Sequence, residues 1–359
     1  MNESTTQECG DVDELDLSLV NVLQLEPRAS WSKVGAALGV DPVTASRRWA
    51  RLTESGSAWV TAHPAGPQTA ALVEIECVAG QARATAEALG RRPHVLTVEH
   101  ASGPRDLLLT VSVTGLGALS RLLLHIEELP GIVSTRAHLV IRPYALGGDW
   151  QLQTLDADQR GHLEAHGQRG PMSLRPLDAT DRGVIATLFR NGRASLTEIA
   201  AELGCSVGTA RRRLHALLDR SALLLRCDVA QPLSGWPVSV SMWAHVPVDE
   251  CDGVAQRLVA LPETRACLVL TGAPANFYFS VWVRSLVDVH RIELLLRRIV
   301  PSLDILDRTV TLRFFKRMGR ILDEHGRSRE SVPMDIWSEP EPVVSADRLA
   351  TPATGIPSK

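Results

Sequence analysis

The chain has 359 residues, of which 45% are hydrophobic, and its formal net charge is −3. This size and composition predict two to four globular domains with ordinary cores. Apolar runs such as 107–109 end within a few residues, far short of the roughly 20 that cross a bilayer, and residues 1–10 are polar and acidic. These features argue against a membrane or secreted protein, and we expect a cytoplasmic one.

The six cysteines show neither paired metal-ligand spacing nor a dense disulfide pattern, which predicts reduced thiols. His162 and His166 stand one helical turn apart, but they lack the other residues of a zinc motif and predict no metal site. The sequence has no glycine-rich phosphate loop and no nucleophile elbow. We therefore expect no catalytic residues, no metal and no cofactor.

An internal repeat organises the chain. Residues 13–60 and 178–225 align without a gap, and 14 of the 48 positions are identical. Each copy opens with an aspartate suited to cap a first helix, Asp13 in one and Asp178 in the other. The repeat predicts two domains of the same fold.

The second helix of each copy follows a shared Arg-Ala-Ser that begins at Arg28 or Arg193. In the second copy Ser195 and Glu198 form a capping box, whereas Lys33 stands at the glutamate position of the first. We expect the second copy to begin this helix more firmly.

The third helix of each copy has the sequence pattern of a DNA-recognition helix. In the second copy Gly204 allows a sharp turn, Ser206 caps the helix, and five arginines against one aspartate lie within residues 206–226. In the first copy Asp41 is the cap and Pro42 the first helical residue. We predict two helix-turn-helix motifs with recognition helices at 42–53 and 207–218.

Short strand-like segments follow each motif, at 58–62 and 223–229, and predict a small wing or linker. A β-α-β-β-α-β pattern comes next in both halves. Its expected elements are strand 70–77, helix 81–89, strands 95–100 and 107–113, helix 116–129 and strand 132–144. In the second half they are strand 238–246, helix 251–261, strands 265–270 and 277–283, helix 287–299 and strand 305–315. Such a split arrangement gives an antiparallel sheet with helices on one face and a second face free to pair.

The predicted organisation therefore has seven segments. They are a disordered N-terminus (1–11), a helix-turn-helix domain (12–62), a ferredoxin-like domain (68–144), a linker (145–176), a second helix-turn-helix domain (177–229), a second ferredoxin-like domain (236–318) and a disordered tail (323–359). One or two helical turns are expected in the linker near 155–166. Pro, Ser, Glu and Gly dominate the tail.

These motifs resemble the Lrp/AsnC family of bacterial transcription regulators. The segment from Asp41 to Gly56 fits the family's recognition helix, and the second copy keeps Ser206, Thr209 and Arg213 but has Ala216 and Ser221 at two pattern positions. The resemblance implies an α+β fold in which two winged-type helix-turn-helix domains alternate with two ferredoxin-like domains. Since single-copy members typically dimerise, the chain resembles such a dimer fused end to end.

The resemblance and the helix pattern together suggest DNA contacts. Bases or nearby phosphates are expected partners of Thr44, Ser46, Arg47, Thr209, Arg211 and Arg212. Phosphate contact or internal support is expected of Arg48, Arg51 and Arg213. Because helical residues step by about 100°, three consecutive arginines cannot all face one way. The alternative is that these arginines only solvate a helix surface.

The family's sheet domain often binds an amino acid or related small molecule. The matching turn here contains Gly103, Arg105 and Asp106, and the second copy has Gly272 and Asn276 in a turn one residue longer. A glycine turn presents N–H groups to a carboxylate, and an acidic side chain suits an ammonium group. The alternative is that both turns are plain hairpin connections.

We expect a sequence-specific transcription regulator, not an enzyme, with double-stranded DNA as partner, an amino-acid-like effector and further self-association into a homo-oligomer. The alternative is an enzyme similar to the sirohaem decarboxylases of tetrapyrrole biosynthesis, which resemble the same family. The segment 276–279 resembles the strand that follows the turn in those enzymes, and His100 lies near the corresponding turn of the first half, whereas the second turn has no histidine. The arginines of both recognition helices favour the regulator.

Overall fold

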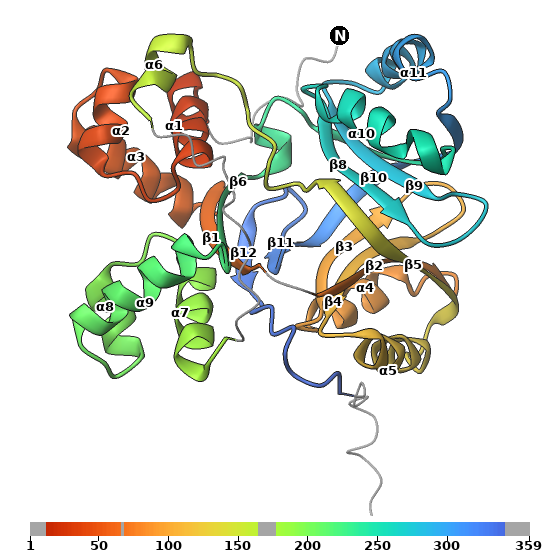
Figure 1. Cartoon of the computed structure of the whole chain (residues 1–359), viewed down its shortest axis with the longest axis horizontal. Coiled ribbons are helices and arrows are strands. Elements are labelled where there is room, and N and C mark those ends of the chain that lie inside the picture. Colours follow the sequence, from red (N-terminus) through yellow and green to blue (C-terminus); the bar gives the residue numbers. More distant parts are fainter. Residues whose placement is uncertain (1–11, 66–67, 164–176, 342–359) are drawn as a thin grey trace, which may run out of the picture.

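The computed structural model describes residues 12–65, 68–163 and 177–341. Two three-helix domains lie one above the other on the left of the molecule (Figure 1). The first contains α1 (Glu14–Leu25), α2 (Trp31–Leu38) and α3 (Pro42–Glu54). The second contains α7 (Ala179–Arg190), α8 (Leu196–Glu202) and α9 (Val207–Asp219). Both domains thus have the predicted helix-turn-helix order.

The helix starts follow the predicted caps. Asp13 forms a capping box at α1, and Ser195 forms one with Glu198 at α8. At α2 the hydroxyl of Ser30 accepts a hydrogen bond from the Lys33 backbone N–H without a reciprocal bond. The second copy therefore has the fuller cap on its second helix, because only it has a glutamate at the third position.

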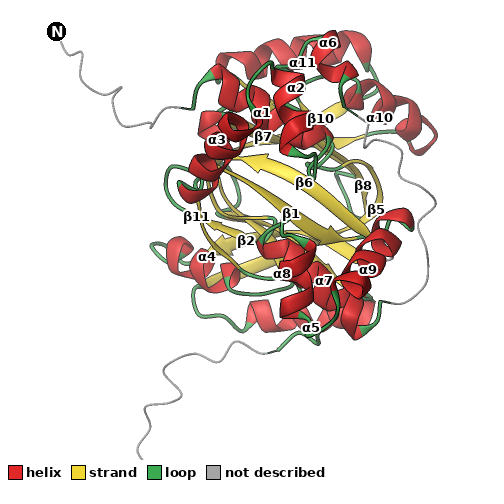
Figure 2. Cartoon of the chain, turned by 90° about the vertical axis from the view of Figure 1, so that its left-hand side faces the viewer, coloured by secondary structure: helices red, strands yellow, loops and turns green. Residues whose placement is uncertain are grey.

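The predicted wings are not separate wings. Strand β1 (Ala58–Pro64) pairs antiparallel with β6 (Leu223–Val229), so the two copies share one two-stranded ribbon. Figure 2 shows the ribbon between the two helical domains. A lone strand leaves a row of backbone N–H and C=O groups unpaired, and the equivalent strand of the other copy satisfies them. The winged-type description is corrected accordingly.

The elements of the two sheet domains lie close to their predicted bounds. The first has β2 (Thr69–Cys77), α4 (Ala82–Gly90), β3 (Val95–Ala101), β4 (Leu107–Val113), α5 (Leu116–Glu127) and β5 (Ile132–Ala145). The second has β7 (Val238–His245), α10 (Cys251–Val259), β8 (Thr264–Leu270), β9 (Phe277–Val283), α11 (Val287–Ile299) and β10 (Asp304–Arg317). Single 3₁₀ turns cover Gln231–Leu233 and Val248–Glu250.

The two sheets join edge to edge into a closed antiparallel barrel. The strands follow the order β10-β3-β4-β2-β5-β8-β9-β7, and β7 pairs again with β10. The joints between the halves are β5 with β8 and β10 with β3. The helices α4 and α5 cover one side of the barrel, and α10 and α11 cover the other (Figure 1). Closure removes the exposed sheet edges that each half would have alone.

Alternate strand positions build two kinds of core. On β2, Ala71, Val73 and Ile75 pack under α4 and α5, and the second half has an equivalent core. Leu72 points the other way, into the barrel, where it meets Leu268 and neighbouring apolar side chains. Both sheet faces are therefore buried, as the near-continuous apolar strands require.

The predicted linker is an ordered connection as far as residue 163. Trp150, Leu152 and Leu155 are buried in one apolar cluster with residues of α1, and the Trp150 ring lies beside Trp282 with its indole N–H donating to the Pro262 carbonyl. Helix α6 (Ala157–Gly161) provides the expected helical turn. The backbone N–H of Leu152 donates to Gln24 and that of Thr154 to Asn21. Burial of these apolar side chains explains why this segment packs between the first helix-turn-helix domain and the second sheet domain. The remainder of the linker and residues 1–11 lie outside the described residues.

The prediction of a disordered tail from residue 323 is wrong as far as residue 341. Strands β11 (Arg320–Leu322) and β12 (Ser328–Ser331) extend the sheet, and Met334 and Ile336 are buried. Ser328 N–H donates to the carbonyl of Gly56 at 2.8 Å, which fastens the segment to the first helix-turn-helix domain. These few apolar residues and backbone pairs outweigh the polar composition that suggested disorder. Residues 342–359 lie outside the described residues.

Within the described ranges, no helix is both long and apolar enough to cross a membrane.

Candidate nucleic-acid interface

Each recognition helix buries one side and exposes the other. In α3 the buried residues are Ala45, Trp49 and Leu52, and in α9 they are Ala210, Leu214 and Leu217. Asp41 accepts a hydrogen bond from the Val43 backbone N–H at 2.8 Å and so begins α3. The 3.6-residue period of the apolar side chains decides which residues remain available to a partner.

Three of the predicted DNA-contacting arginines are exposed. Arg47, Arg211 and Arg212 have no ion pair or side-chain hydrogen bond to any described residue. In the repeat, Arg212 is the equivalent of Arg47, whereas Arg211 replaces Ser46. Unpaired guanidinium groups on a recognition helix are suited to phosphate oxygens and to guanine edges.

Arg48 and its equivalent Arg213 are half-buried and bind carboxylates of their own domains. Arg48 donates to Asp13 at 2.7 Å and to Asp16 at 3.0 Å, where Asp16 is fully buried. The hydrogen bonds to Asp13 and Asp16 raise the pKa of Arg48 above its ordinary value. Of the two roles predicted for Arg48, the structure provides internal support.

The second domain repeats this arrangement. Arg213 donates to Asp178 at 2.6 Å and to Asp181 at 3.3 Å. Asp178 and Asp181 align with Asp13 and Asp16 of the first copy. The carboxylates of the first helix thus hold the recognition helix in both domains.

The buried aspartate, Asp16 or Asp181, has a second arginine partner in each copy. This second arginine stands at a different repeat position in the two copies. Arg51 contacts Asp16 in the first copy, and its equivalent in the second is Ala216. There Arg220, about one helical turn later, reaches Asp181 at 2.7 Å instead. The sequence analysis missed Arg220, whose signal was a lone arginine just beyond the recognition helix.

Thr44, Ser46 and Thr209 are half-buried at the starts of the recognition helices. The Thr209 hydroxyl lies 3.1 Å from that of Ser206, the capping residue of α9. Thr209 is therefore engaged with the cap while it remains partly accessible.

A reciprocal pair of arginines joins the two helix-turn-helix domains. Arg28 donates to the carbonyls of Gly192 at 2.7 Å and Ala194 at 2.8 Å. Arg193 donates to the carbonyls of Pro27 and Ala29, both at 2.7 Å. Burial lowers the pKa of Arg193 to about 10. The shared Arg-Ala-Ser was visible in the sequence, but its role across the domains was not.

The turn of the first sheet domain engages its own predicted effector residues. Arg105 is 6% exposed and donates to Glu74 at 2.9 Å, Thr309 at 2.8 Å and Asp307 at 2.5 Å. Asp106 accepts a hydrogen bond from the Cys77 backbone N–H at 2.7 Å. Arg105 therefore ties the first sheet domain to β10 of the second.

The turn Gly103–Asp106 needs glycine, because Gly103 has a φ of +90°. In the second copy Gly272 has a φ of +113°, and an added Cβ would lie 3.1 Å from the His138 ring. The Asn276 side-chain oxygen accepts a hydrogen bond from the Val246 backbone N–H at 2.9 Å, and the Asn276 side-chain nitrogen donates to the Val246 carbonyl at 2.8 Å. Asp106 and Asn276 thus both bind the backbone at the end of a strand. Of the two histidines in the linker, His166 lies outside the described residues.

Comparisons with known proteins follow the same division of the chain. Residues 12–53 and 177–218 match the AsnC-type helix-turn-helix domain, and residues 70–148 match the Lrp/AsnC ligand binding domain. An uncharacterized HTH-type transcriptional regulator of Pyrococcus horikoshii is 25% identical over 136 residues, covering 36% of this chain and 86% of the relative. A similar regulator of Pyrococcus abyssi is 27% identical over 135 residues, covering 36% and 85%.

The crystal structure of the siroheme decarboxylase NirDL covers 88% of this chain and 96% of its own, with a TM-score of 0.58 and 14% identity. At that identity the likeness concerns the fold, and it extends over both halves. The regulators, in contrast, each match little more than a third of the chain. Two AsnC-type helix-turn-helix domains and an Lrp/AsnC ligand-binding domain in one polypeptide make this chain a tandem member of the Lrp/AsnC family.

Proposed function

We propose that the protein is a DNA-binding transcription regulator in which α3 and α9 both contact DNA. The observation that carries the proposal is that adjacent arginines of each recognition helix have different surroundings. Arg48 and Arg213 form ion pairs with aspartates of their own domains, while the neighbouring Arg47 and Arg212 are exposed at equivalent positions and have no such partner among the described residues. Two copies that keep the same exposed cation are better explained by a shared ligand than by solvation.

The connection between the domains supports simultaneous binding of both helices. The β1–β6 ribbon and the Arg28–Arg193 pair hold the two helix-turn-helix domains as one unit. In paired motifs, recognition helices enter successive major grooves about one helical turn apart. We assign that geometry to α3 and α9.

The remaining contacts follow from position on the helices. Thr44, Ser46 and Thr209 stand in the first turns, where residues approach base edges. Arg211 adds a cation to the second copy that the first lacks, so the two domains favour different half-sites. Arg48, Arg51 and Arg213 position the helices and contribute little direct affinity.

The sheet domains carry the response to a small molecule and further self-association. An amino acid is the effector that we assign to the turns at Gly103, Asp106, Gly272 and Asn276. Arg105 already has three protein partners, and both polar groups of the Asn276 side chain are bound to Val246, so these two side chains order their turns. The backbone of the turns and the Asp106 carboxylate are the groups that we assign to the effector. Sedimentation velocity with and without each amino acid tests both assignments.

Fluorescence anisotropy with DNA from upstream of the protein's own gene tests DNA binding, with non-coding DNA of equal length as comparison. We expect Arg47→Ala and Arg212→Ala each to weaken specific binding by about 1–3 kcal/mol if the arginine contacts a base. If the arginine contacts a phosphate instead, the slope of log affinity against log salt concentration should fall by about one, and binding to all DNA sequences should weaken equally. Arg297→Ala, an exposed arginine of α11, is the matched control.

Equal binding of both DNAs by the wild type, with no effect of either variant, would contradict the regulator proposal. Loss through only one variant would mean that one helix-turn-helix domain has a purely structural role. In the first case, absorption titration with a sirohaem-type tetrapyrrole is the next measurement, because it tests the enzyme alternative directly.

A further inference from the structure

The closed barrel contains a cavity of about 580 Å³ between its two sheets. Leu72, Val140, Leu268 and Phe314 contribute to its mainly apolar wall, and the end of the β1–β6 ribbon covers one side. Cavities of this size commonly hold small organic ligands, with a few polar groups to orient them. In this cavity the charged groups are mostly arginines, and they lie on one side of it.

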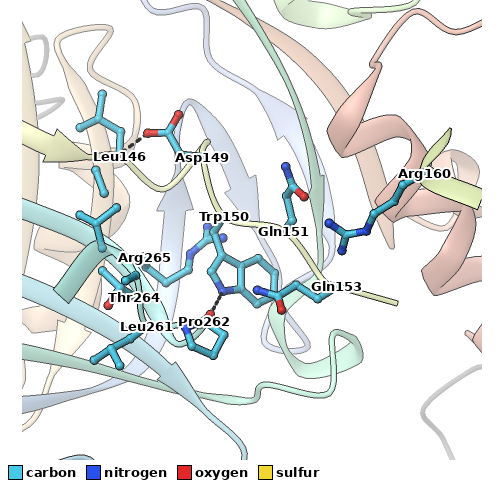
Figure 3. Close-up of a pocket in the computed structure, with 13 residues that line it drawn as sticks. Leu146, Asp149, Trp150, Gln151, Gln153, Arg160, Leu261, Pro262, Thr264 and Arg265 are labelled. Atoms are coloured by element: carbon cyan, nitrogen blue, oxygen red, sulfur yellow. Dashed lines mark hydrogen bonds between the residues drawn. The ribbon is translucent and has the colours of Figure 1, made fainter. Parts of the chain in front are cut away.

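Three buried arginines line the cavity from three different strands. They are Arg226 on β6, Arg265 on β8 and Arg317 on β10, with exposed fractions of 8%, 7% and 5%. The guanidinium carbon of Arg265 lies 3.8 Å from the centre of the Trp282 ring, and that of Arg317 lies 5.4 Å away. Figure 3 shows Arg265 beside a second indole, that of Trp150, at the wall of the neighbouring pocket.

These arginines outnumber their carboxylate partners. Asp228 pairs with Arg226 at 2.5 Å and with Arg317 at 3.2 Å. Arg265 makes no hydrogen bond or ion pair with any described residue, and Asp228 and, more weakly, Asp149 attract it only from beyond ion-pair distance. Two nitrogens of Arg317 and one of Arg226 are likewise without a hydrogen-bond partner in the described part of the chain.

A buried positive charge without a partner is costly, so this excess needs an explanation. Glu99 also lines the cavity, but burial raises its pKa to about 7, and it accepts a hydrogen bond from Thr311 at 2.6 Å. Glu99 therefore does not neutralise the arginines fully. An anion inside the cavity would supply the missing charge.

The positive charge is confined to one side of the cavity. The strand registers relate the two halves by a pseudo-twofold axis, so each residue has an equivalent on the opposite side. Arg265 corresponds to Leu96, and Arg317 corresponds to Leu146. Both leucines line the same cavity. The cavity is thus cationic on one side and apolar on the other.

We propose that this cavity binds an organic anion with an apolar body and a single carboxylate-type head group. Planar guanidinium groups suit a carboxylate, because they donate two parallel hydrogen bonds to its two oxygens. The head group would lie among Arg226, Arg265 and Arg317, and the apolar body would extend along Leu268 toward Leu96. Medium-chain carboxylates are the simplest molecules of this class. This site is separate from the turns at Gly103 and Gly272 and does not depend on DNA binding.

Isothermal titration calorimetry of the full-length protein, without DNA, tests the proposal with decanoate, decanol and inorganic phosphate as probes. We expect decanoate to bind at one site at least about tenfold more tightly than decanol or phosphate. Ala266→Phe fills the cavity from its wall and should abolish decanoate binding while all three arginines remain. Arg265→Gln should reduce the preference for decanoate over decanol to less than about threefold.

Arg297→Gln on the outer helix α11 is the control and should leave the titration unchanged. If Arg265→Gln does not fold by circular dichroism, Ala266→Phe still decides the location of the site. Equal binding of decanoate and decanol, binding of phosphate as tight as that of decanoate, or decanoate binding unaffected by Ala266→Phe would each overturn the proposal. A sirohaem-type tetrapyrrole that binds where decanoate does not would overturn the single-head-group assignment. Decanoate binding by a protein that fails to bind DNA would refute the regulator and leave this site intact.

Discussion

The two helix-turn-helix domains reach the same packing with different arginines. Both place a fully or nearly fully buried aspartate on the first helix, Asp16 or Asp181, and both give it two guanidinium partners. One partner occupies equivalent positions in the two copies, whereas the other comes from Arg51 in the first and Arg220 in the second. The comparison teaches that the buried aspartate must have two positively charged partners, whereas the sequence position of one of these arginines can differ between the copies.

The β1–β6 ribbon differs from the helical domains, because equivalent positions of its two strands carry side chains of different charge. Asp228 in the second copy corresponds to His63 in the first. Asp228 pairs with two arginines, while His63 is buried without a hydrogen-bond partner for either ring nitrogen among the described residues. Pseudo-symmetry in the backbone therefore does not imply symmetry in charge.

Asp228→Asn should break this asymmetry with the largest effect. Removal of the carboxylate leaves Arg226 and Arg317 buried without their anion, and we expect a loss of about 3–5 kcal/mol in the free energy of unfolding. Urea unfolding followed by circular dichroism measures it. His63→Asn at the equivalent position is the control and should cost much less. Similar costs for both variants would show that Asp228 is not the charge partner that stabilises the ribbon.

Arg220→Ala and Arg51→Ala sharpen the comparison of the two helical domains. The Arg220 side chain is only 14% exposed, and its loss should cost about 1.5–3 kcal/mol, as for a hydrogen bond between charged groups. The Arg51 side chain is 50% exposed, so its removal should cost only about 0–1 kcal/mol. Paired unfolding titrations of the two variants make the test. A larger loss from Arg51→Ala would reverse our assignment of the two partners.

The pH dependence of stability should distinguish His63 from Asp228. Burial, together with the positive charge of Arg226, lowers the pKa of His63 to about 3 from its ordinary 6.5. Between pH 3 and 6.5 the unfolded chain thus binds a proton that the folded chain excludes, so stability falls as the pH is lowered, by at most about 1.4 kcal/mol per pH unit.

His63→Leu should flatten this dependence between pH 6.5 and 5, as measured by unfolding midpoints at several pH values. Glu99 acts in the opposite direction, because its raised pKa makes the folded chain bind the additional proton between about pH 4.5 and 7. Glu99→Gln is therefore the matched control and should steepen the loss of stability on acidification. An unchanged slope in His63→Leu would rule out His63 as its source.

Ser221→Gly is expected to have the smallest effect and the opposite sign. Ser221 has a φ of +50°, and the equivalent residue of the first copy is Gly56 with a φ of +69°. A left-handed conformation costs a serine more than a glycine, so the variant should be stabilised by about 1 kcal/mol. Differential scanning calorimetry would detect the higher Tm. A lower Tm would mean that the gain in unfolded-chain entropy outweighs relief of the backbone.

Much of the architecture was predictable because it depends on local signals. The caps at Asp13 and Ser195 and the apolar periodicity located the helices and strands of both copies. The exposed side of α3 followed from the same periodicity, which left Arg47 outside while Ala45 and Trp49 packed inside. The tail was different: Met334 and Ile336 are too few to mark a domain, and only their burial against residues distant in the chain orders that segment.

The amino-acid sequence by itself determined the repeat, the element order and the identity of the recognition helices, because capping, turns and hydrophobic periodicity act over a few neighbouring residues. Only the tertiary structure decided that β1 pairs with β6, that the two sheets close into one barrel, and that Arg226, Arg265 and Arg317 meet beside a single aspartate. The physical reason is that strand pairing and buried charge clusters depend on which distant segments of the chain come together in space. The spacing of residues along the sequence does not specify those contacts.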